Sequence, residues 1–465
     1  MRRDNEFRYS RLANILREQI MSGFIKPGEY LLSENELCKY YGISRTSVRK
    51  SLEQLQKEGL IVKKVGQGTI VSPDLVIPPS ERRTLRILAT SPSHYADLCL
   101  GHIIETFQSK FPHVDVKLLS IPSWNFWESL RASEELGRYP DLVLVTDRNF
   151  ADAALTESFL DLGDHLGDLL GSLYPRVALP FRDRGVQIAV PSTFSPVYLA
   201  YNPDLFARFG VEEPADGWDK DAFVEASRRL TADLDGDGIV DTYGFSLSAL
   251  FSRWPVVALQ NGVKFDSFSN RDDIVRSLNF FHDVLYRERV ATLSRGSRPF
   301  LHEKAAMTLT TTIEMAGWRS DQMPFESKIA PLPFGPHQST LLVANAFMVP
   351  KESEERELAL SFLRVAFDPA LQRRLTEETG FLSCMPGVTE AVWDAASLSG
   401  LNISKGRIEN GYFLHELFAD VDTIEELGAE MELFWGGLEK AESLADRMTG
   451  ILNKVPHKAN PASDG

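Results

Sequence analysis

Residues 33–50 read SENELCKYYGISRTSVRK and decide the fold of the first part of the chain. Ser33 and Glu36 form a capping box, because the hydroxyl accepts from a backbone N–H three residues on while the carboxylate bonds back to the first N–H. A helix therefore begins at Ser33 and ends near Gly42. Ser44 opens the next helix, whose apolar positions again repeat at helical spacing. Two short helices joined by a tight turn predict a helix-turn-helix.

The flanking sequence extends this motif on both sides. Residues 9–21 carry Leu12, Leu16 and Ile20 on one helical face. Residues 60–71 predict a hairpin with glycines at its tip. The whole predicts a winged helix-turn-helix, a domain that places its recognition helix in the major groove of DNA. The expected DNA contacts lie on that helix, at the helix caps and on the wing, and they are Ser33, Ser44, Arg45, Thr46, Arg49, Lys50, Lys64, Gly66 and Gln67.

The same segments carry a family resemblance. They combine Pro27, Gly28, Leu32, Ser33, Glu34, Leu37, Gly42, Ser44, Arg45, Thr46, Val48, Arg49, Leu52, Gly59, Gly66 and Gly68. In this order the residues resemble the DNA-binding domain of GntR-type transcriptional regulators. The resemblance implies that Arg45, Thr46, Arg49 and Gly66 contact DNA. Asn35 departs from the family pattern, since many members carry a basic side chain there.

Composition and charge divide the chain unevenly. The 465 residues are 43% hydrophobic and carry a formal charge of −15. Residues 1–75 hold 13 Lys and Arg against 9 Asp and Glu, a balance of +4, which leaves −19 for the rest. An acidic protein that binds DNA must confine its phosphate contacts to a basic face. We expect a cytoplasmic globular protein, because neither a long apolar run nor a signal-peptide pattern is present. The three cysteines, Cys38, Cys99 and Cys384, suggest neither a disulfide nor a metal site.

A linker and a second kind of pattern follow the basic segment. Residues 72–84 are rich in proline and charge and show no helical or strand period. Beyond them, short apolar runs alternate with helical patterns, which predicts a doubly wound α/β sheet. We therefore expect a winged helix-turn-helix at residues 1–71, here called the head, a linker at 72–84, an α/β body at 85–452 and a polar tail at 453–465.

The body also carries motifs in a set order. The longest are VPSTFSPVYLAYNPDLF at residues 190–206 and DLDGDGIVDTYG at 233–244. With shorter motifs at 300–307 and 330–333 they resemble family 1 extracellular solute-binding proteins, the carbohydrate receptors of ABC importers. The resemblance implies a type II periplasmic-binding-protein fold, in which two α/β lobes joined by crossing strands close on a sugar or oligosaccharide. Those receptors are exported, whereas this chain carries a DNA-binding head.

Aromatic and polar residues at expected strand ends are candidates for a sugar site, because sugars present both apolar faces and hydroxyl groups. Trp124 and Trp127 follow the second strand of the body, in an expected loop at the edge where open α/β sheets bind ligands. Asp147 ends the next strand. Lobe packing and helix capping are the alternative roles of these residues. The resemblance adds five weaker candidates: Tyr198, Trp254, Glu314, Trp318 and Asn345.

The acidic loop at residues 233–244 has the spacing of a calcium-binding EF-hand loop. Its candidate ligands are the carboxylates of Asp233, Asp235, Asp237 and Asp241 and the carbonyl of Ile239. Position 12 is Gly244 where an EF-hand has a bidentate glutamate, so the ligand set is incomplete. Structural calcium and a solvated acidic turn both stay open, and no other cofactor is expected.

These observations predict a ligand-responsive transcriptional regulator that binds a pseudo-palindromic DNA operator as a homodimer. Closure of the lobes on a sugar would move residues 72–84 and with them the two heads. An enzyme is not expected, because no G-x-S-x-G, H-E-x-x-H or P-loop motif is present. Two alternatives stay open: a regulator with an aminotransferase-like body that binds pyridoxal phosphate, and a solute-binding protein with a vestigial head.

Overall fold

The structure is a computed structural model of the 465-residue chain. The chain divides into two compact units, residues 1–87 with 101–119 and residues 88–100 with 120–465. The boundaries expected at 71, 84 and 452 stay predictions. Among the described residues, no helix has the length and apolar character that a membrane crossing requires. The described residues are 12–17, 19–21, 25–41, 43–64, 68–75, 83–122, 126–135, 139–150, 157–215, 217–265, 271–294, 296–318, 323–418 and 420–454.

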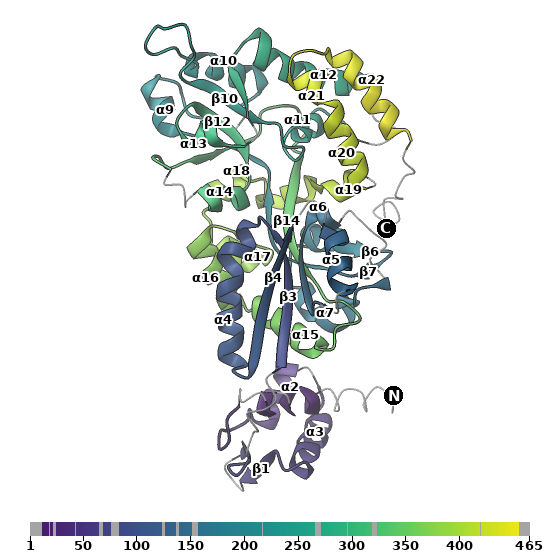
Figure 1. Ribbon diagram of the computed structural model, residues 1–465. Coiled ribbons are helices and arrows are strands. Elements are labelled where there is room, and N and C mark those ends of the chain that lie inside the picture. Colours follow the sequence, from purple (N-terminus) through teal and green to yellow (C-terminus); the bar gives the residue numbers. More distant parts are fainter. Residues whose placement is uncertain are drawn as a thin grey trace. The chain divides into compact units, whose positions relative to one another are not determined.

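The head consists of helices followed by a hairpin (Figure 1). Residues 12–17 and 19–21 are helical, and α2 (Glu34–Tyr41) and α3 (Arg45–Lys57) follow. Strands β1 (Ile61–Lys64) and β2 (Gly68–Val71) pair antiparallel, with Lys64 opposite Gly68. This order confirms the predicted winged helix-turn-helix. The tip of the wing, with Gly66 and Gln67, lies outside the described residues.

Local hydrogen bonds explain why the two helices begin where they do. Glu36 N donates to Ser33 Oγ over 3.3 Å, and Ser33 N donates to Glu36 Oε2 over 2.8 Å, so the predicted capping box is confirmed. Ser44 caps α3 by accepting from Ser47 N over 3.2 Å. The inner faces of the helices and the hairpin share one core, which contains Leu12, Leu16, Ile20, Leu37, Val48, Leu52, Leu55, Ile61 and Val71.

The body begins with the predicted alternation of strands and helices. It runs β3 (Arg83–Ser91), α4 (Gly101–Lys110), β4 (Val114–Pro122), α5 (Phe126–Glu135) and β5 (Leu142–Thr146). These strands join β8 (Val190–Pro196), β14 (Thr340–Met348), β15 (Leu382–Ser383) and β16 (Gly411–Phe413) in a seven-stranded sheet. The order is β15-β8-β14-β5-β3-β4, with β16 beside β14. Because β14 is antiparallel to both β5 and β8, the sheet is mixed, which the alternation of elements did not predict.

A second sheet has five strands in the order β11-β10-β12-β9-β13. Its strands are β9 (Tyr198–Tyr201), β10 (Tyr243–Ser248), β11 (Ala291–Ser294), β12 (Ala305–Thr310) and β13 (Lys328–Ala330). β10 is parallel to β11 and β12, while β9 is antiparallel to β12 and β13. The core beside this sheet is rich in aromatic rings: Phe223 meets both Phe245 and Phe334 edge to face with centroids 5.3 Å apart.

The chain passes between the two sheets at β8 and β14. β8 ends at Pro196 in the first sheet, and β9 begins at Tyr198 in the second. Val197, between them, donates its N–H to Leu341 O over 2.8 Å and accepts from Thr340 Oγ1 over 2.6 Å. We call the part around the seven-stranded sheet the first lobe and the part around the five-stranded sheet the second lobe. Two lobes joined by crossing strands confirm the implied fold.

Helices surround both sheets. Near the first sheet are α6 (Asp147–Phe150), α7 (Leu162–Leu170), α8 (Pro175–Ala178), α15 (Arg356–Ala366), α16 (Pro369–Thr379) and α17 (Pro386–Val392). The second lobe carries α9 (Pro203–Arg208), α10 (Lys220–Leu230), α11 (Pro255–Gln260), α12 (Arg271–His282), α13 (Arg298–Leu301) and α14 (Thr312–Trp318). Later in the chain come α18 (Ala395–Gly400), α19 (Leu414–Leu417), α20 (Val421–Glu430), α21 (Glu432–Trp435) and α22 (Ala441–Leu452), and α22 packs on α12 (Figure 1).

One glycine in the second lobe is required by a close approach of two elements. Gly244, in β10, lies against α10, and a Cβ built on it would stand 2.4 Å from both Cα and O of Ser227. Backbone atoms cannot give way as the end of a flexible side chain can. A side chain at position 244 would therefore push α10 away from the sheet.

We predict that Gly244→Ala lowers the free energy of unfolding by at least about 1–3 kcal/mol, the usual cost of overpacking. Differential scanning calorimetry of the full chain measures the effect. The matched control is Gly450→Ala in α22, where a Cβ would meet no atom within 4 Å. Alanine is the better helix former there, so the control should be neutral or more stable. Equal melting temperatures for the two variants would contradict the close approach.

Candidate functional site

The outer face of α3 presents two arginines that share one carboxylate. Arg45 Nε donates to Glu34 Oε2 over 3.2 Å, and Arg49 Nε donates to the same oxygen over 2.9 Å. More than half of each arginine side chain is exposed. The hydrogen bond from Arg49 is the main reason why the pKa of Glu34 lies below its usual range. The expected recognition helix therefore carries two accessible guanidinium groups held from one side.

The other predicted DNA contacts in the head are also on its surface. Thr46 and Lys50 are exposed on α3, and Lys64 is exposed at the end of β1. Ser33 and Ser44 are exposed as well, although their hydroxyl groups already accept the capping hydrogen bonds. All these residues are exposed to solvent. Their contacts with DNA stay predictions.

In the second lobe, Glu314 gathers a group of polar side chains. It accepts from Arg253 Nη2 over 2.7 Å, from Ser297 Oγ over 2.7 Å and from Thr310 Oγ1 over 3.1 Å. The Arg253 side chain is only 6% exposed, so this ion pair is largely withdrawn from water. Removing one partner from such a pair leaves an uncompensated buried charge.

Arg253 and its neighbour Trp254 each have one buried hydrogen-bond donor without a partner among the described residues. Arg253 Nη1 donates to Ser252 Oγ over 2.8 Å, but its Nε is buried and has no partner in the described part of the chain. Trp254 is 1% exposed, its ring meets Phe251 and Phe265 edge to face, and its Nε1 likewise has no partner there. Buried donors of this kind are unusual and call for an explanation.

Asp147 and Asn345 belong to the first lobe. Asp147 follows β5, is 5% exposed, and accepts from Ala344 N over 3.0 Å. Burial raises its pKa to about 7, an effect that the hydrogen bond from Ala344 N and, to a smaller extent, the positive charges of Arg148 and Arg253 oppose. The neighbouring Asn345 is also buried, and no hydrogen-bond donor meets its Oδ1 among the described residues.

These residues form one group, which we call the interlobe cluster: Asp147, Arg253, Trp254, Glu314 and Asn345. Glu314 bonds to Arg253, the neighbour of Trp254, and Asp147 bonds to Ala344, the neighbour of Asn345. The start of α14, which carries Glu314, is hydrogen-bonded to Ser195 of β8, and β8 pairs with β14, which carries Asn345. Two unpaired donors and one unpaired acceptor could bind the hydroxyl groups of a polar ligand. The structure thus brings together four of the predicted ligand residues, whose contact with a ligand stays a prediction.

Three of the other predicted ligand residues, Trp127, Tyr198 and Trp318, are buried. Trp127 lies in the first turn of α5 and not in the expected loop, its ring is buried against Phe126 and Phe159, and its Nε1 donates to Asn149 O over 2.7 Å. Trp318 is buried beside Phe300, and Tyr198 is buried in β9. Trp124 lies outside the described residues. Trp127 therefore takes part in the packing of the first lobe, and its contact with a ligand stays a prediction.

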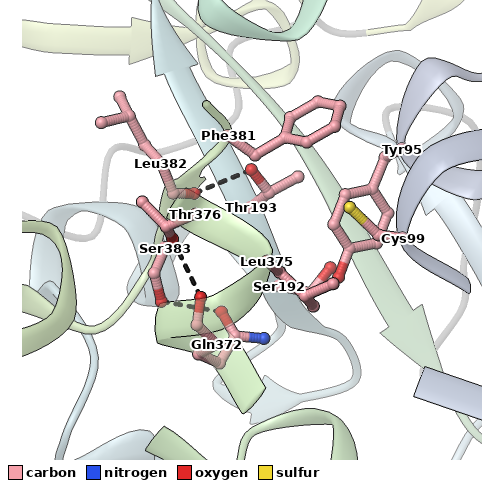
Figure 2. Close-up of a pocket in the computed structure, with 10 residues that line it drawn as sticks. All are labelled: Tyr95, Cys99, Ser192, Thr193, Gln372, Leu375, Thr376, Phe381, Leu382 and Ser383. Atoms are coloured by element: carbon pink, nitrogen blue, oxygen red, sulfur yellow. Dashed lines mark hydrogen bonds between the residues drawn. The ribbon is translucent and has the colours of Figure 1, made fainter. Parts of the chain in front are cut away.

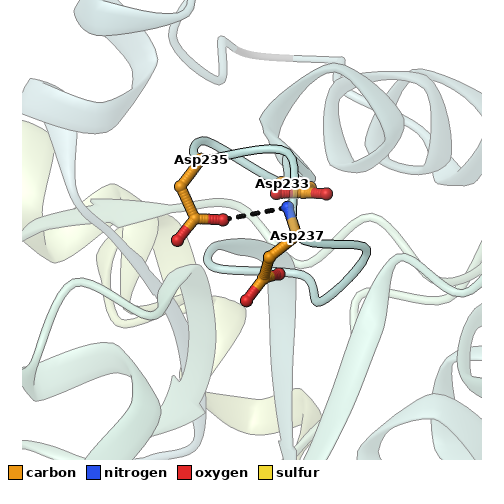
Figure 3. A group of neighbouring side chains, drawn as sticks. All are labelled: Asp233, Asp235 and Asp237. Carbon is orange, nitrogen blue, oxygen red and sulfur yellow. Dashed lines mark hydrogen bonds between the residues drawn. The ribbon is translucent and has the colours of Figure 1, made fainter.

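The acidic loop brings three carboxylates together (Figure 3). Oxygens of Asp233, Asp235 and Asp237 lie within 4.8 Å of one another. Backbone N–H groups of the loop also bond to these carboxylates. Asp233 accepts from Gly238 N and Gly236 N, and these bonds lower its pKa. Asp235 accepts from Asp237 N, and Asp237 accepts from Ile239 N. Asp241 Oδ1 lies 3.6 Å from Lys304 Nζ. A side chain at position 12 would meet the backbone of Ser227, so the loop has no room for a glutamate there. Metal binding stays a prediction.

A small cavity lies in the first lobe between β8, β15 and α16 (Figure 2). Its volume is about 10 Å³, which is room for a single water molecule. Thr193 Oγ1 donates across it to Leu382 O, and burial raises the pKa of the Cys99 thiol on its wall to about 12. The cavity is too small for a sugar, so it does not compete with the interlobe cluster as a ligand site.

Sequence reasoning missed Arg253 and Ser297. Arg253 stands directly before the apolar run of α11, and a charge beside a buried segment is a usable signal. Its partner Glu314, however, lies 61 residues away, so the pairing itself requires the fold. Ser297 carries no distinguishing signal in the sequence.

Two families match the chain. Residues 8–71 match the family described as bacterial regulatory proteins, gntR family. Residues 102–398 match the family described as bacterial extracellular solute-binding protein.

Similar proteins include two regulators. The arabinose metabolism transcriptional repressor of Geobacillus stearothermophilus is 29% identical over 129 residues, which are 28% of this chain and 34% of that protein. The mannosyl-D-glycerate transport/metabolism system repressor of Escherichia coli is 38% identical over 68 residues, 15% of this chain and 28% of that protein. The chain therefore spans about a third or less of the length of these relatives.

Solved structures resemble the body. An ABC substrate-binding protein of Listeria monocytogenes in complex with cycloalternan superposes with a TM-score of 0.69 at 18% identity, covering 80% of this chain and 99% of that one. A solute-binding protein of Thermotoga lettingae bound with α-D-tagatose gives 0.67 at 15% identity, covering 80% and 100%. At these identities the likeness shows a common fold. With the family match over most of its length, the chain belongs to the bacterial extracellular solute-binding protein family, and it carries a gntR-family regulatory domain at residues 8–71.

Proposed function

We propose that the protein is a transcriptional regulator that binds an operator through its head and senses a sugar or oligosaccharide with its body. The observation that carries this proposal is the combination, in one chain, of a winged helix-turn-helix with a two-lobed body whose interlobe cluster holds unpaired buried polar atoms. The first feature can bind DNA, and the second can bind a polar ligand.

The sugar is supported by chemistry and by likeness. Arg253 Nε and Trp254 Nε1 are donors and Asn345 Oδ1 is an acceptor, a mixture that suits hydroxyl groups, each of which both donates and accepts. Similar solved structures hold cycloalternan and tagatose, and the similar repressors act in arabinose and mannosyl-D-glycerate metabolism. A carbohydrate is therefore the first ligand class to test.

The working mechanism links the two parts through residues 72–84. A ligand that contacts both lobes favours the arrangement in which the lobes close on it. Closure would move the linker and change how two heads fit two half-sites about one helical turn apart. The regulator acts in the cytoplasm and catalyses no reaction in this proposal. The domain boundaries at 71 and 84 belong to it as well.

Substitutions in the recognition helix should separate DNA binding by the head from sugar binding by the body. Arg45→Ala with Arg49→Ala should abolish binding to a duplex that the unaltered protein selects from a random library, because both guanidinium groups that face DNA are lost. The same variant should keep the rise in melting temperature that a sugar gives. Fluorescence anisotropy of labelled duplexes and a thermal-shift screen over mono- and oligosaccharides measure the two properties.

The reciprocal variant is the control. Asn345→Ala removes an unpaired acceptor of the interlobe cluster and touches no residue of the head, so it should weaken the sugar shift and keep duplex binding. If the double arginine variant still binds the selected duplex, the head is not the DNA-binding part. If no carbohydrate raises the melting temperature of the unaltered protein, the sugar class is wrong.

Another prediction concerns the pH dependence of stability that Asp147 causes. In the unfolded chain Asp147 titrates near pH 4, whereas burial raises its native pKa to about 7. Between these values the unfolded chain gives up a proton that the native protein keeps, so the free energy of unfolding falls as the pH rises from about 4 to 7 and levels off above. A difference of about three units corresponds to up to about 4 kcal/mol.

Asp147→Asn removes this titration. The free energy of unfolding of the variant relative to the unaltered protein should therefore increase between pH 5 and pH 8 by about 2–3 kcal/mol. Urea unfolding at the two pH values measures it. The control is Asp221→Asn, which replaces an exposed aspartate of α10 and should show no such increase. A constant difference for Asp147→Asn would mean that the carboxyl group is not buried.

We also propose that the protein is a homodimer, because one head reads only one half-site of a two-fold operator. An edge strand supports this. β4 ends the strand order of the first sheet, and Leu118 and Leu119, which point to opposite sides of a strand, are 43% and 39% exposed. Proteins usually cover or interrupt such an edge, and a second copy of the same strand can cover it.

The expected mass in solution is twice 52.2 kDa, measured by light scattering at micromolar concentration. Leu118→Arg with Leu119→Arg should reduce it to that of one chain, because buried charges oppose pairing at the edge. Leu433→Arg, at an exposed position of α21, is the matched control and should leave the mass unchanged. A dimer that survives the double substitution would place the contact elsewhere.

A further inference from the structure

Glu34 occupies an unexpected place for an acidic residue. It lies in the first turn of α2, and its Oε2 accepts from Nε of both Arg45 and Arg49. The Glu34 side chain is 24% exposed, whereas the two arginine side chains are exposed by 60% and 55%. A negative charge therefore stands behind the two cations that are expected to meet DNA.

The geometry of the guanidinium group decides which N–H groups of Arg45 and Arg49 remain available beside the contact with Glu34. Each group is planar and has one N–H at Nε and two at each Nη atom. Glu34 uses the Nε side of both arginines, and no hydrogen bond within the described part of the chain uses their Nη atoms. The two Nη atoms together can still bond bidentately, end-on, to a guanine or a phosphate.

The Glu34 carboxylate also lowers the affinity of the head for DNA of any sequence. Non-specific affinity comes almost entirely from neutralised phosphates. A fixed negative charge between two arginines weakens that attraction for every sequence alike. Orientation of the arginines, by contrast, helps only on a duplex whose groups lie where the Nη atoms point.

We propose that Glu34 is a positioning residue for sequence discrimination. It holds the Nη edges of Arg45 and Arg49 in fixed directions and lowers the affinity for other DNA, so that it raises the ratio of specific to non-specific binding. This inference rests on the proposed DNA-binding function of the head.

A purely structural role for Glu34 is the alternative. Acidic residues in the first turn of a helix stabilise it through the helix dipole. Glu36 is the matched residue for this role, because it lies in the same turn of α2, carries the same charge and bonds to Ser33. Its bonds in the head go to the cap and not to the arginines, and glutamine also serves in a capping box.

The experiment compares Glu34→Gln with Glu36→Gln in the full-length protein. Two labelled duplexes are used: one that the unaltered protein selects from a random library, and one of the same length and composition with a shuffled sequence. Fluorescence anisotropy gives both dissociation constants over a series of salt concentrations, and circular dichroism with a thermal melt checks the fold of each variant.

For Glu34→Gln we expect about tenfold weaker binding of the selected duplex and equal or up to about threefold tighter binding of the shuffled one. The ratio of the two constants should thus fall at least about tenfold. Glu36→Gln should keep the ratio of the unaltered protein. Matching melts for the two variants would separate the loss from unfolding.

Two results would overturn the proposal. Glu34→Gln could tighten binding of both duplexes by the same factor, which would make Glu34 a general repulsive charge. Both glutamine variants could also change the ratio equally, which would make the effect one of helix stability. Failure of the proposed function is a different outcome, because the unaltered protein would then select no sequence from the library.

Discussion

The pairing of β14 with β8 is the contact on which the body depends. The two strands lie side by side in the first sheet, β8 is buried along its whole length, and the chain leaves both of them to enter or return from the second lobe. At the crossing, Ser195 Oγ accepts from Thr312 N at the start of α14, and Val197 bonds to Leu341. These two bonds, one to a side-chain hydroxyl and one between backbone groups, join the lobes at the crossing.

That crossing also explains where the interlobe cluster lies. Asn345 is part of β14, and Asp147 bonds to the preceding Ala344, while Glu314 belongs to the helix that Ser195 helps to start. Residues from four distant segments of the sequence meet because they adjoin the same pair of strands. An ion pair with its desolvation cost is tolerated there because Ser297 and Thr310 supply further hydrogen bonds to Glu314.

The head could be predicted nearly in full from the sequence, because its decisive bonds are local. Ser33 and Glu36 are three residues apart, and so are Ser44 and Ser47. The body was predictable as a fold through its motifs and its alternation of elements. The insertion of β14 between β5 and β8 was not, because antiparallel pairing of strands some 200 residues apart leaves no period in the sequence. The sequence also predicted a loop at Trp127. In the structure α5 begins at Phe126, and the Trp127 ring is buried.

The division of the cluster between the lobes sets a thermodynamic condition on the proposed regulator. Asp147 and Asn345 come from one lobe, and Arg253 and Glu314 come from the other. A ligand that bonds to both pairs gains its full binding free energy in one arrangement of the lobes only, so it shifts their equilibrium by the difference in affinity. If that shift changes operator affinity by some factor, the operator must change ligand affinity by the same factor. If operator binding by the head did not depend on the arrangement of the lobes, the operator and the ligand would bind independently, whatever their affinities.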